Sequence, residues 1–123
     1  MSIYRVANVS DEPWITLAQW SIRRATANES VEGNNYFVGR NLSTDEGRVS
    51  TPIIEFDPMT RTGVTRSGRR YRLVGRAGRN GDADYVWDRI ASVWAIESWL
   101  DVTAELVPDW RNDNPLSEYE PPE

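Results

Sequence analysis

Seven arginines lie between residues 61 and 79, and no acidic residue interrupts them. This segment carries seven positive charges in a chain whose formal net charge is −5, so the rest of the chain sums to −12. Each guanidinium group presents a rigid fork of donors that suits phosphates and carboxylates. We therefore predict that the segment binds a partner through seven residues: Arg66, Arg69, Arg70, Tyr71, Arg72, Arg76 and Arg79.

Two other interpretations of this arginine-rich segment are open. A nucleic acid could be the ligand, with the arginines on its phosphates and the ring of Tyr71 stacked on a base. Alternatively, the arginines face solvent and pair with the protein's own carboxylates, as charged strands often do. Because the chain is acidic overall and repels nucleic acid, we favour a protein partner over direct nucleic-acid binding.

Acidic residues dominate the C-terminal end, where Arg111 is the only positive charge after residue 101. Such a segment can imitate a phosphate backbone and enter a basic nucleic-acid channel, with aromatic side chains as anchors. The corresponding partner-binding residues would be Asp109, Trp110, Asp113, Glu118 and Glu120. The alternative is a solubilising tail, because residues 108–123 are polar, acidic and rich in proline, a composition that predicts disorder.

The composition removes most catalytic chemistry. The chain has no histidine and no cysteine, and all fourteen of its basic residues are arginine. General-base histidines, Cys or His metal ligands and Schiff-base lysines are thereby excluded. Carboxylate pairs remain, for example Glu55 with Asp57 or Asp84 with Asp88. Such spacings arise by chance among nineteen acidic residues, so we predict no enzyme, no cofactor and no metal site.

A glycine-rich run from Gly75 to Gly81 precedes a predicted helix and superficially resembles an anion-binding loop. Its glycine spacing matches neither the dinucleotide-binding fingerprint nor the Walker A loop. Asp82 at the start of the helix would also occupy the backbone donors that a phosphate needs. We interpret the run as a plain connection between a strand and a helix.

The apolar pattern predicts several strands and one helix. Residues 14–26 fit a helix or a strand, and we favour a strand with alternate residues on one side: Trp14, Thr16, Ala18, Trp20 and Ile22. Further strands are predicted at 3–9, 35–40, 48–56, 62–66 and 69–74, the last two joined by the turn Ser67-Gly68. In the last strand, Tyr71 and Leu73 should share one face. Residues 82–99 predict a long helix capped by Asp82.

These elements predict an α+β fold: a mostly antiparallel sheet of about five strands, with a meander over 48–75 and one long C-terminal helix over 82–99 on one face. Residues 1–107 would form a single domain, followed by the acidic tail 108–123. The chain contains no apolar run typical of a signal peptide or long enough to span a bilayer. We therefore predict a cytoplasmic protein that does not associate with membranes.

Five stretches carry a resemblance to other proteins: Gly47–Ile53, Phe56-Asp57, Thr65–Arg69, Tyr71–Leu73 and Tyr85–Trp87. In these stretches the chain resembles small uncharacterised proteins of proteobacteria, their plasmids and their phages. The resemblance covers roughly residues 14–103, and its motifs are structural, so it implies no catalytic activity. It implies that the gene belongs to a mobile element, where small acidic proteins without cofactors often inhibit host defence, as anti-CRISPR proteins do.

Charge segregation and this resemblance together predict a non-enzymatic, protein-binding inhibitor from a phage or mobile element. It would act in the host cytoplasm and block a nucleoprotein or other nucleic-acid-handling complex. The arginine-rich segment would meet acidic side chains of that complex, or join copies of the protein into a homo-oligomer. The alternative function is a nucleic-acid or nucleotide-binding module that uses the arginine-rich hairpin 61–79.

Overall fold

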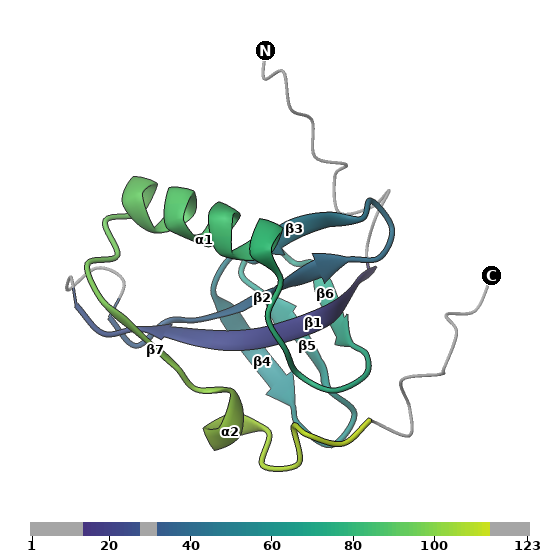
Figure 1. Ribbon diagram of the computed structural model, residues 1–123. Helices are drawn as coiled ribbons and strands as arrows, with labels where there is room; N and C mark the ends of the chain where they lie inside the picture. The colour runs from purple at the N-terminus through teal and green to yellow at the C-terminus, as the bar shows by residue number, and fades with distance from the viewer. Residues whose placement is uncertain (1–13, 28–31, 114–123) are drawn as a thin grey trace.

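The computed structural model describes residues 14–27 and 32–113, and the strand predicted over 3–9 lies outside these residues. In chain order the elements are β1 (Trp14–Ala25), β2 (Asn35–Asn41), β3 (Glu46–Val49), β4 (Ile53–Asp57), β5 (Thr62–Thr65), β6 (Arg70–Leu73), α1 (Gly81–Val93), β7 (Trp99–Asp101) and α2 (Thr103–Leu106), as Figure 1 shows. The fold is α+β, as predicted, but it has more strands and shorter helices than expected.

One mixed sheet holds the strands of the described residues. Their order is β3-β2-β1-β6-β5-β4, and β7 pairs with the C-terminal half of β1. Most neighbouring strands are antiparallel, but β1 and β6 run parallel. The described sheet is therefore mixed and has seven strands, whereas a mostly antiparallel sheet of about five strands was predicted. Local sequence patterns show where strands lie, but not that the last strand of the meander returns to pair with the first long strand.

The sheet curls until its two ends come together. β3 and β4 lie at opposite ends of the strand order, yet only residues 50–52 separate them in the chain. The N–H of Ser50 donates to the carbonyl of Phe37 in β2 (2.9 Å), and the carbonyl of Pro52 accepts from Arg66 after β5 (2.8 Å). The single strand predicted over 48–56 is thus two strands, interrupted beside Pro52, which has no N–H to donate.

A bulge in β1 decides which of its residues face inward. The pairing of β1 with β2 shifts register between Ala18 and Ser21, and Gln19 has a left-handed φ of 49°. Because the bulge adds one residue, Trp20 returns to the side of the preceding inward residues, so the inner core contains Ile15, Leu17, Trp20 and Ile22. The strand interpretation of residues 14–26 is confirmed, but the predicted face was wrong because strict alternation cannot reveal a bulge.

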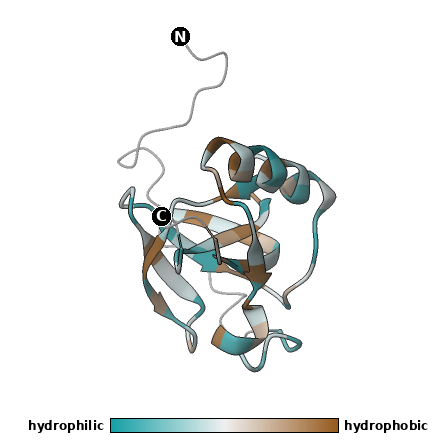
Figure 2. Ribbon diagram, turned by 90° about the vertical axis from the view of Figure 1, so that its left-hand side faces the viewer, coloured by the Kyte–Doolittle hydropathy of each residue, from teal (hydrophilic) through white to brown (hydrophobic). Residues whose placement is uncertain are grey.

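Two apolar cores lie on opposite faces of β1 and β2. Phe37 points into the curled sheet, whereas its neighbours Tyr36 and Val38 point outward, under α1. The Tyr36 ring meets Trp87 of α1 edge-on at 5.6 Å between centroids and stacks on Trp94 at 5.5 Å. In Figure 2 hydrophobic residues, drawn in brown, occur both in the strands and in part of α1. β2 is therefore buried on both faces, and α1 covers the outer face.

The helix α1 is shorter than predicted. Asn80 caps it, since its side-chain carbonyl accepts from the N–H of Ala83 (2.9 Å), so the predicted cap Asp82 lies inside the first turn. The helix ends at Val93, and Ala95 adopts a left-handed φ of 57°. The prediction of one long helix over 82–99 was wrong because the chain turns back to form β7 beside β1. No helix in the described part of the chain is long and apolar enough to cross a membrane.

Candidate functional site

The structure divides the arginine-rich segment between the interior and the surface. Arg61, Arg69 and Arg72 are buried, with 1%, 6% and 7% of their surface exposed. The exposed members of the segment are Arg66, Arg70, Arg76 and Arg79. Because side chains alternate between the two faces of β5 and β6 and the adjoining loops turn away, the seven charges do not share one surface.

Arg61 fastens the C-terminal segment to the sheet. Its Nη1 donates to the carbonyl of Gly75 (2.8 Å), and its Nη2 donates to the carbonyls of Asp109 (2.9 Å) and Asn112 (3.0 Å). The guanidinium carbon also lies 5.3 Å from the ring centroid of Trp20. Since these contacts occupy its donors inside the protein, Arg61 acts as a structural clamp.

Arg70 and Arg72 lie against Trp14, the first residue of β1. Their guanidinium carbons are 5.8 Å and 4.5 Å from the centroid of the indole ring. Tyr71, between them, points into the inner core together with Leu73, and only 1% of its surface is exposed. The predicted shared face of Tyr71 and Leu73 is confirmed. A Tyr71 ring in the core cannot stack on a nucleic-acid base, so it lacks the role that the nucleic-acid interpretation offered for it.

Asp84, in the first turn of α1, bridges two arginines. The buried Arg23 donates through Nη2 to Oδ1, and Arg79 donates through Nη2 to Oδ2 (3.0 Å). Burial raises the pKa of Asp84, but hydrogen bonds from the two arginines and their positive charges outweigh that effect and hold the pKa below its usual value. Asp84 is therefore an ionised partner of arginines, which does not suit it to act as the acid of a pair with Asp88.

The other carboxylate pair, Glu55 and Asp57, shares a surface. Both line a groove of about 410 Å³ over β4, β5 and β6, together with Trp14 and Arg70. Both carboxylates belong to exposed residues, and Asp57 accepts from the N–H of Met59 (2.9 Å) in the turn after β4. Within residues 14–27 and 32–113, no three carboxylates come together as a metal site would require.

A larger groove of about 650 Å³ lies between β3, the β5–β6 turn and α1. Each of these segments contributes one arginine to it: Arg48 from β3, Arg69 from the turn and Arg89 from α1. Tyr71 and Tyr85 line the same groove. We call it the basic groove, because it gathers three guanidinium groups from segments that are far apart in the sequence.

Tyrosine hydroxyls orient two of these arginines. The Nε of Arg48 donates to the hydroxyl of Tyr71 (3.1 Å), and the Nη1 of Arg89 donates to the hydroxyl of Tyr85 (3.1 Å). The remaining guanidinium nitrogens of Arg48 and Arg89 have no hydrogen-bond or ion-pair partner among the described residues. They are therefore available to oxygen atoms of a ligand, and each arginine is already held in place on one side.

Gly47 allows α1 to approach β3 at one end of the basic groove. A Cβ at this position would lie 2.3 Å from the backbone nitrogen of Ala83, so no larger residue fits without moving the helix. The N–H of Gly47 donates to the carboxylate of Asp82 (2.7 Å). This contact fixes the distance between the two walls of the groove.

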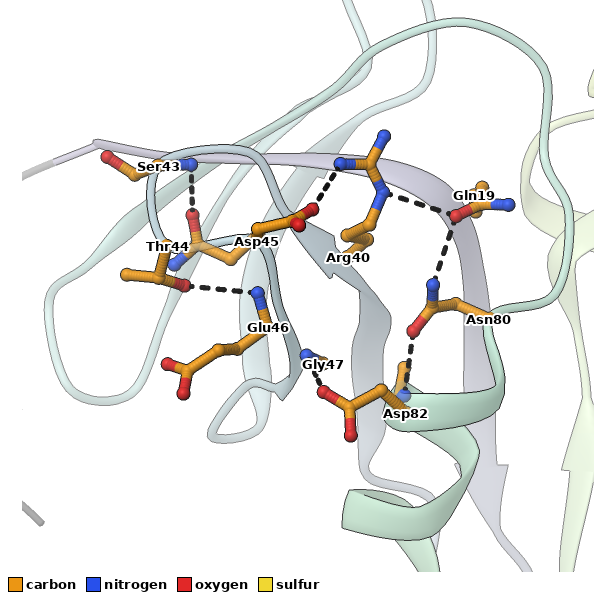
Figure 3. A network of polar contacts seen from close by, with 11 residues as sticks. Gln19, Arg40, Ser43, Thr44, Asp45, Glu46, Gly47, Asn80 and Asp82 are labelled. Atoms are coloured by element: carbon orange, nitrogen blue, oxygen red, sulfur yellow. Dashed lines mark hydrogen bonds and ion pairs between the residues drawn. The ribbon is translucent and has the colours of Figure 1, made fainter.

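A polar network extends from the start of α1 to the bulge in β1 (Figure 3). The side-chain carbonyl of Gln19 accepts from Asn80 (3.0 Å) and from the Nε of Arg40 (3.2 Å). Arg40 also pairs with Asp45 in the β2–β3 turn (2.8 Å). The network joins the bulge, the end of β2 and the beginning of α1. It holds the α1 wall of the groove against the sheet.

The lining of the basic groove combines charge with apolar surface. Glu46 and Asp82 line it as well as the three arginines, so its charge is mainly, but not purely, positive. The half-buried side chains of Val49, Val86 and Ile90 supply the apolar part. The groove therefore offers sites for anionic groups next to surface that favours contact with apolar side chains.

The C-terminal residues predicted to bind a partner are four acidic residues and Trp110, and those that the structure describes differ in burial and contacts. Asp109 is held by Arg61, with 3.5 Å between Nη2 and the carboxylate. Trp110 packs against the inner core, and its carbonyl accepts from the N–H of Ala77 (3.0 Å). Asp113 is exposed, and the remaining two members, Glu118 and Glu120, lie outside the described residues.

Sequence reasoning missed Arg48 and Arg89. Neither belongs to a run of like charges, and Arg89 directly follows the acidic Asp88. Only the packing of α1 beside β3 brings them to the same groove as Arg69. The spacing of Tyr85 and Arg89, one helical turn apart, is the one sequence signal that could have indicated their contact.

Comparisons of the chain with family models, curated proteins and solved structures found no match.

Proposed function

We propose that the protein is a non-catalytic protein-binding module that holds acidic side chains of its partner in the basic groove. The observation that carries this proposal is the presence of Arg48, Arg69 and Arg89, from three separate segments, in one groove. Arginine and tyrosine are among the residues that contribute most to binding energy at protein interfaces. The absence of histidine, cysteine and lysine from the sequence also favours binding over catalysis.

A protein partner suits the basic groove better than a nucleic acid. Glu46 and Asp82 line the groove, and the whole chain carries a net charge of −5, so a long polyanion is repelled. An acidic stretch of protein carries fewer negative charges than a nucleic acid. It can place these charges beside the arginines and away from Glu46 and Asp82. The position of the Tyr71 ring in the inner core is a further argument against a nucleic acid.

We also propose the more specific role that the sequence predicts: an inhibitor from a phage or mobile element that blocks a nucleic-acid-handling complex in the host cytoplasm. The presence of a basic groove together with exposed acidic residues on the same molecule supports this role. Acidic residues such as Asp113 would face basic surfaces of that complex, while the basic groove would hold one of its acidic segments. Such two-signed complementarity gives an interface both specificity and a fast rate of association.

An affinity experiment on an extract of the host cell tests the proposed function. The full chain, the double variant Arg48→Glu/Arg89→Glu and the control Arg111→Glu serve as baits. Arg111 is exposed and lies outside the basic groove. We expect one host protein on the wild type and the control that is absent from the double variant. Retention of the same proteins by all three baits would contradict docking in the groove, and the absence of any specific protein would contradict the binding role.

Direct nucleic-acid binding is the second candidate function. It is favoured by the exposure of Arg66, Arg70 and Arg76, which form no ion pair within the described part of the chain. A mobility-shift assay at low salt distinguishes the two functions. Binding that weakens steeply with added salt and disappears in Arg66→Glu/Arg70→Glu would favour this function over the protein-binding module.

A further inference from the structure

We infer that the basic groove selects an acidic peptide segment in which an apolar side chain lies between the carboxylates. This inference rests on the proposed function and adds the chemistry of the segment that the groove holds. It starts from the arrangement of charged and apolar residues on the two walls of the groove.

The α1 wall carries two parallel stripes. Tyr85 and Arg89 are one helical turn apart and form the polar stripe, in which the hydroxyl holds the guanidinium. Val86 and Ile90 are also one turn apart and form an apolar stripe immediately beside it. A ligand that reaches Arg89 with a carboxylate therefore passes directly over apolar surface.

The β3 wall repeats this combination. Arg48 and Val49 both line the groove, and Arg48 is oriented by the hydroxyl of Tyr71. On each wall, then, a guanidinium group with nitrogens available to a ligand adjoins a half-buried aliphatic side chain. A segment with a carboxylate for each wall and an apolar side chain between them matches both walls at once.

The size of the groove limits the length of this segment. A volume of about 650 Å³ is within the range of pockets that hold a drug-sized ligand. It accommodates a few side chains and not a whole element, so the minimal match is acid–apolar–acid. Covering Val86 and Ile90 would remove apolar surface from water, which strengthens binding beyond the charge pairs alone.

Three labelled peptides, identical outside their central residues, serve as probes: Asp-Leu-Asp, Asp-Ser-Asp and Asn-Leu-Asn. Affinity is measured by fluorescence anisotropy with the full chain. We expect Asp-Leu-Asp to bind at least about tenfold more tightly than either comparison peptide, since one buried leucine or one pair of charge-assisted hydrogen bonds is worth at least that factor.

Two variants of α1 test which wall residues are responsible. Val86→Thr keeps the shape of the side chain but replaces one of its methyl groups with a hydroxyl, so Asp-Leu-Asp should lose part of its advantage over Asp-Ser-Asp. Val93→Thr is the matched control, because Val93 is 77% exposed on the same helix and does not line the groove. This control should bind all three peptides as the wild type does.

The outcomes separate this inference from the proposed function. Equal binding of Asp-Leu-Asp and Asp-Ser-Asp, lost in Arg48→Gln/Arg89→Gln, would overturn the apolar selection and leave the basic groove as a docking site for acidic segments. Binding of Asn-Leu-Asn as tight as that of Asp-Leu-Asp would overturn both. If no peptide binds, the inference is overturned, and the experiment with host extract decides the proposed function by itself.

Discussion

Arg61 and Arg89 are the same residue type used in opposite ways. Arg61 comes from the dense run of arginines, is 1% exposed and donates to three backbone carbonyls. Arg89 stands beside an acidic residue in the sequence, is exposed and donates only to the hydroxyl of Tyr85 among the described residues. The density of charge along a chain therefore does not indicate which charges remain available to a partner.

The physical reason lies in desolvation. A buried guanidinium is tolerated only when protein oxygens or aromatic faces replace the water it loses. Arg61 satisfies this requirement with carbonyls and Trp20. The buried Arg23 does so in part, with Asp84 and the rings of Trp87 and Trp99, although its Nε has no hydrogen-bond partner among the described residues. The exposed Arg89 of the basic groove keeps its hydration and can exchange it for a ligand.

The largest expected effect follows from removing the clamp. Arg61→Leu removes one donor from each of three carbonyls and the contact that joins the C-terminal segment to the sheet. The carbonyls of Gly75 and Asp109 keep a second donor, from Trp20 and Asn112, but the Asn112 carbonyl loses the donor that Arg61 supplies. We expect the free energy of unfolding to fall by about 3–5 kcal/mol, the usual range for breaking a buried charged network. Urea denaturation measures the change. The control Arg111→Leu concerns an exposed arginine over the Trp110 ring and should change stability by less than about 0.5 kcal/mol. Equal effects of the two substitutions would show that Arg61 is no clamp.

The bridge at Asp84 should make stability depend on pH. Its folded-state pKa lies below the unfolded value of about 3.9, so the stabilisation is complete above about pH 5 and is lost as the pH falls towards the folded-state pKa. We expect Asp84→Asn to lower the free energy of unfolding by about 2–3 kcal/mol at pH 7. The difference from the wild type should shrink between pH 5 and pH 3. A difference independent of pH would contradict the ionised bridge.

The close contact between β3 and α1 should tolerate no side chain. Gly47→Ala places a Cβ against the backbone of Ala83, and we expect a loss of about 1–3 kcal/mol in the free energy of unfolding. Gly81→Ala is the matched control, because nothing lies within 4 Å of a Cβ there and alanine favours the helix. Thermal denaturation should show a lower Tm for the first variant only.

A smaller effect on stability, with a clear effect on binding, is expected in the groove itself. Arg89→Gln removes an exposed charge and should change the free energy of unfolding by less than about 0.5 kcal/mol. Its affinity for the Asp-Leu-Asp peptide should fall by about five- to tenfold, as expected for one charge-assisted contact. Unchanged affinity would mean that Arg89 does not meet the ligand.

The smallest effect concerns the hydroxyl that holds Arg89. Tyr85→Phe keeps the ring and the charge but removes the acceptor for Nη1. We expect a two- to threefold weaker affinity, since a solvent-exposed hydrogen bond that orients a side chain contributes about 0.5 kcal/mol. Stability should not change within error. A loss as large as that of Arg89→Gln would mean that the hydroxyl itself contacts the ligand.

Local patterns predicted those elements whose structure depends on nearby residues. The alternation that places Tyr71 and Leu73 on one face of β6 needs no information from the rest of the chain. The bulge at Gln19 depends on side chains as distant as Asn80, and the end of α1 at Val93 depends on pairing between β7 and β1. For this reason neither the bulge nor the end of the helix was predicted from the sequence. Tertiary contacts override local periodicity in each case.

The sequence by itself determined the α+β class, the segregation of charge and the absence of histidine, cysteine and lysine. Only the tertiary structure decided which arginines remain available. It buries Arg61 under the C-terminal segment and brings Arg48 and Arg89 together across the contact of Gly47 with α1. The composition sets how many arginines the chain has. Whether each arginine can contact a partner depends on its burial and on contacts between distant segments.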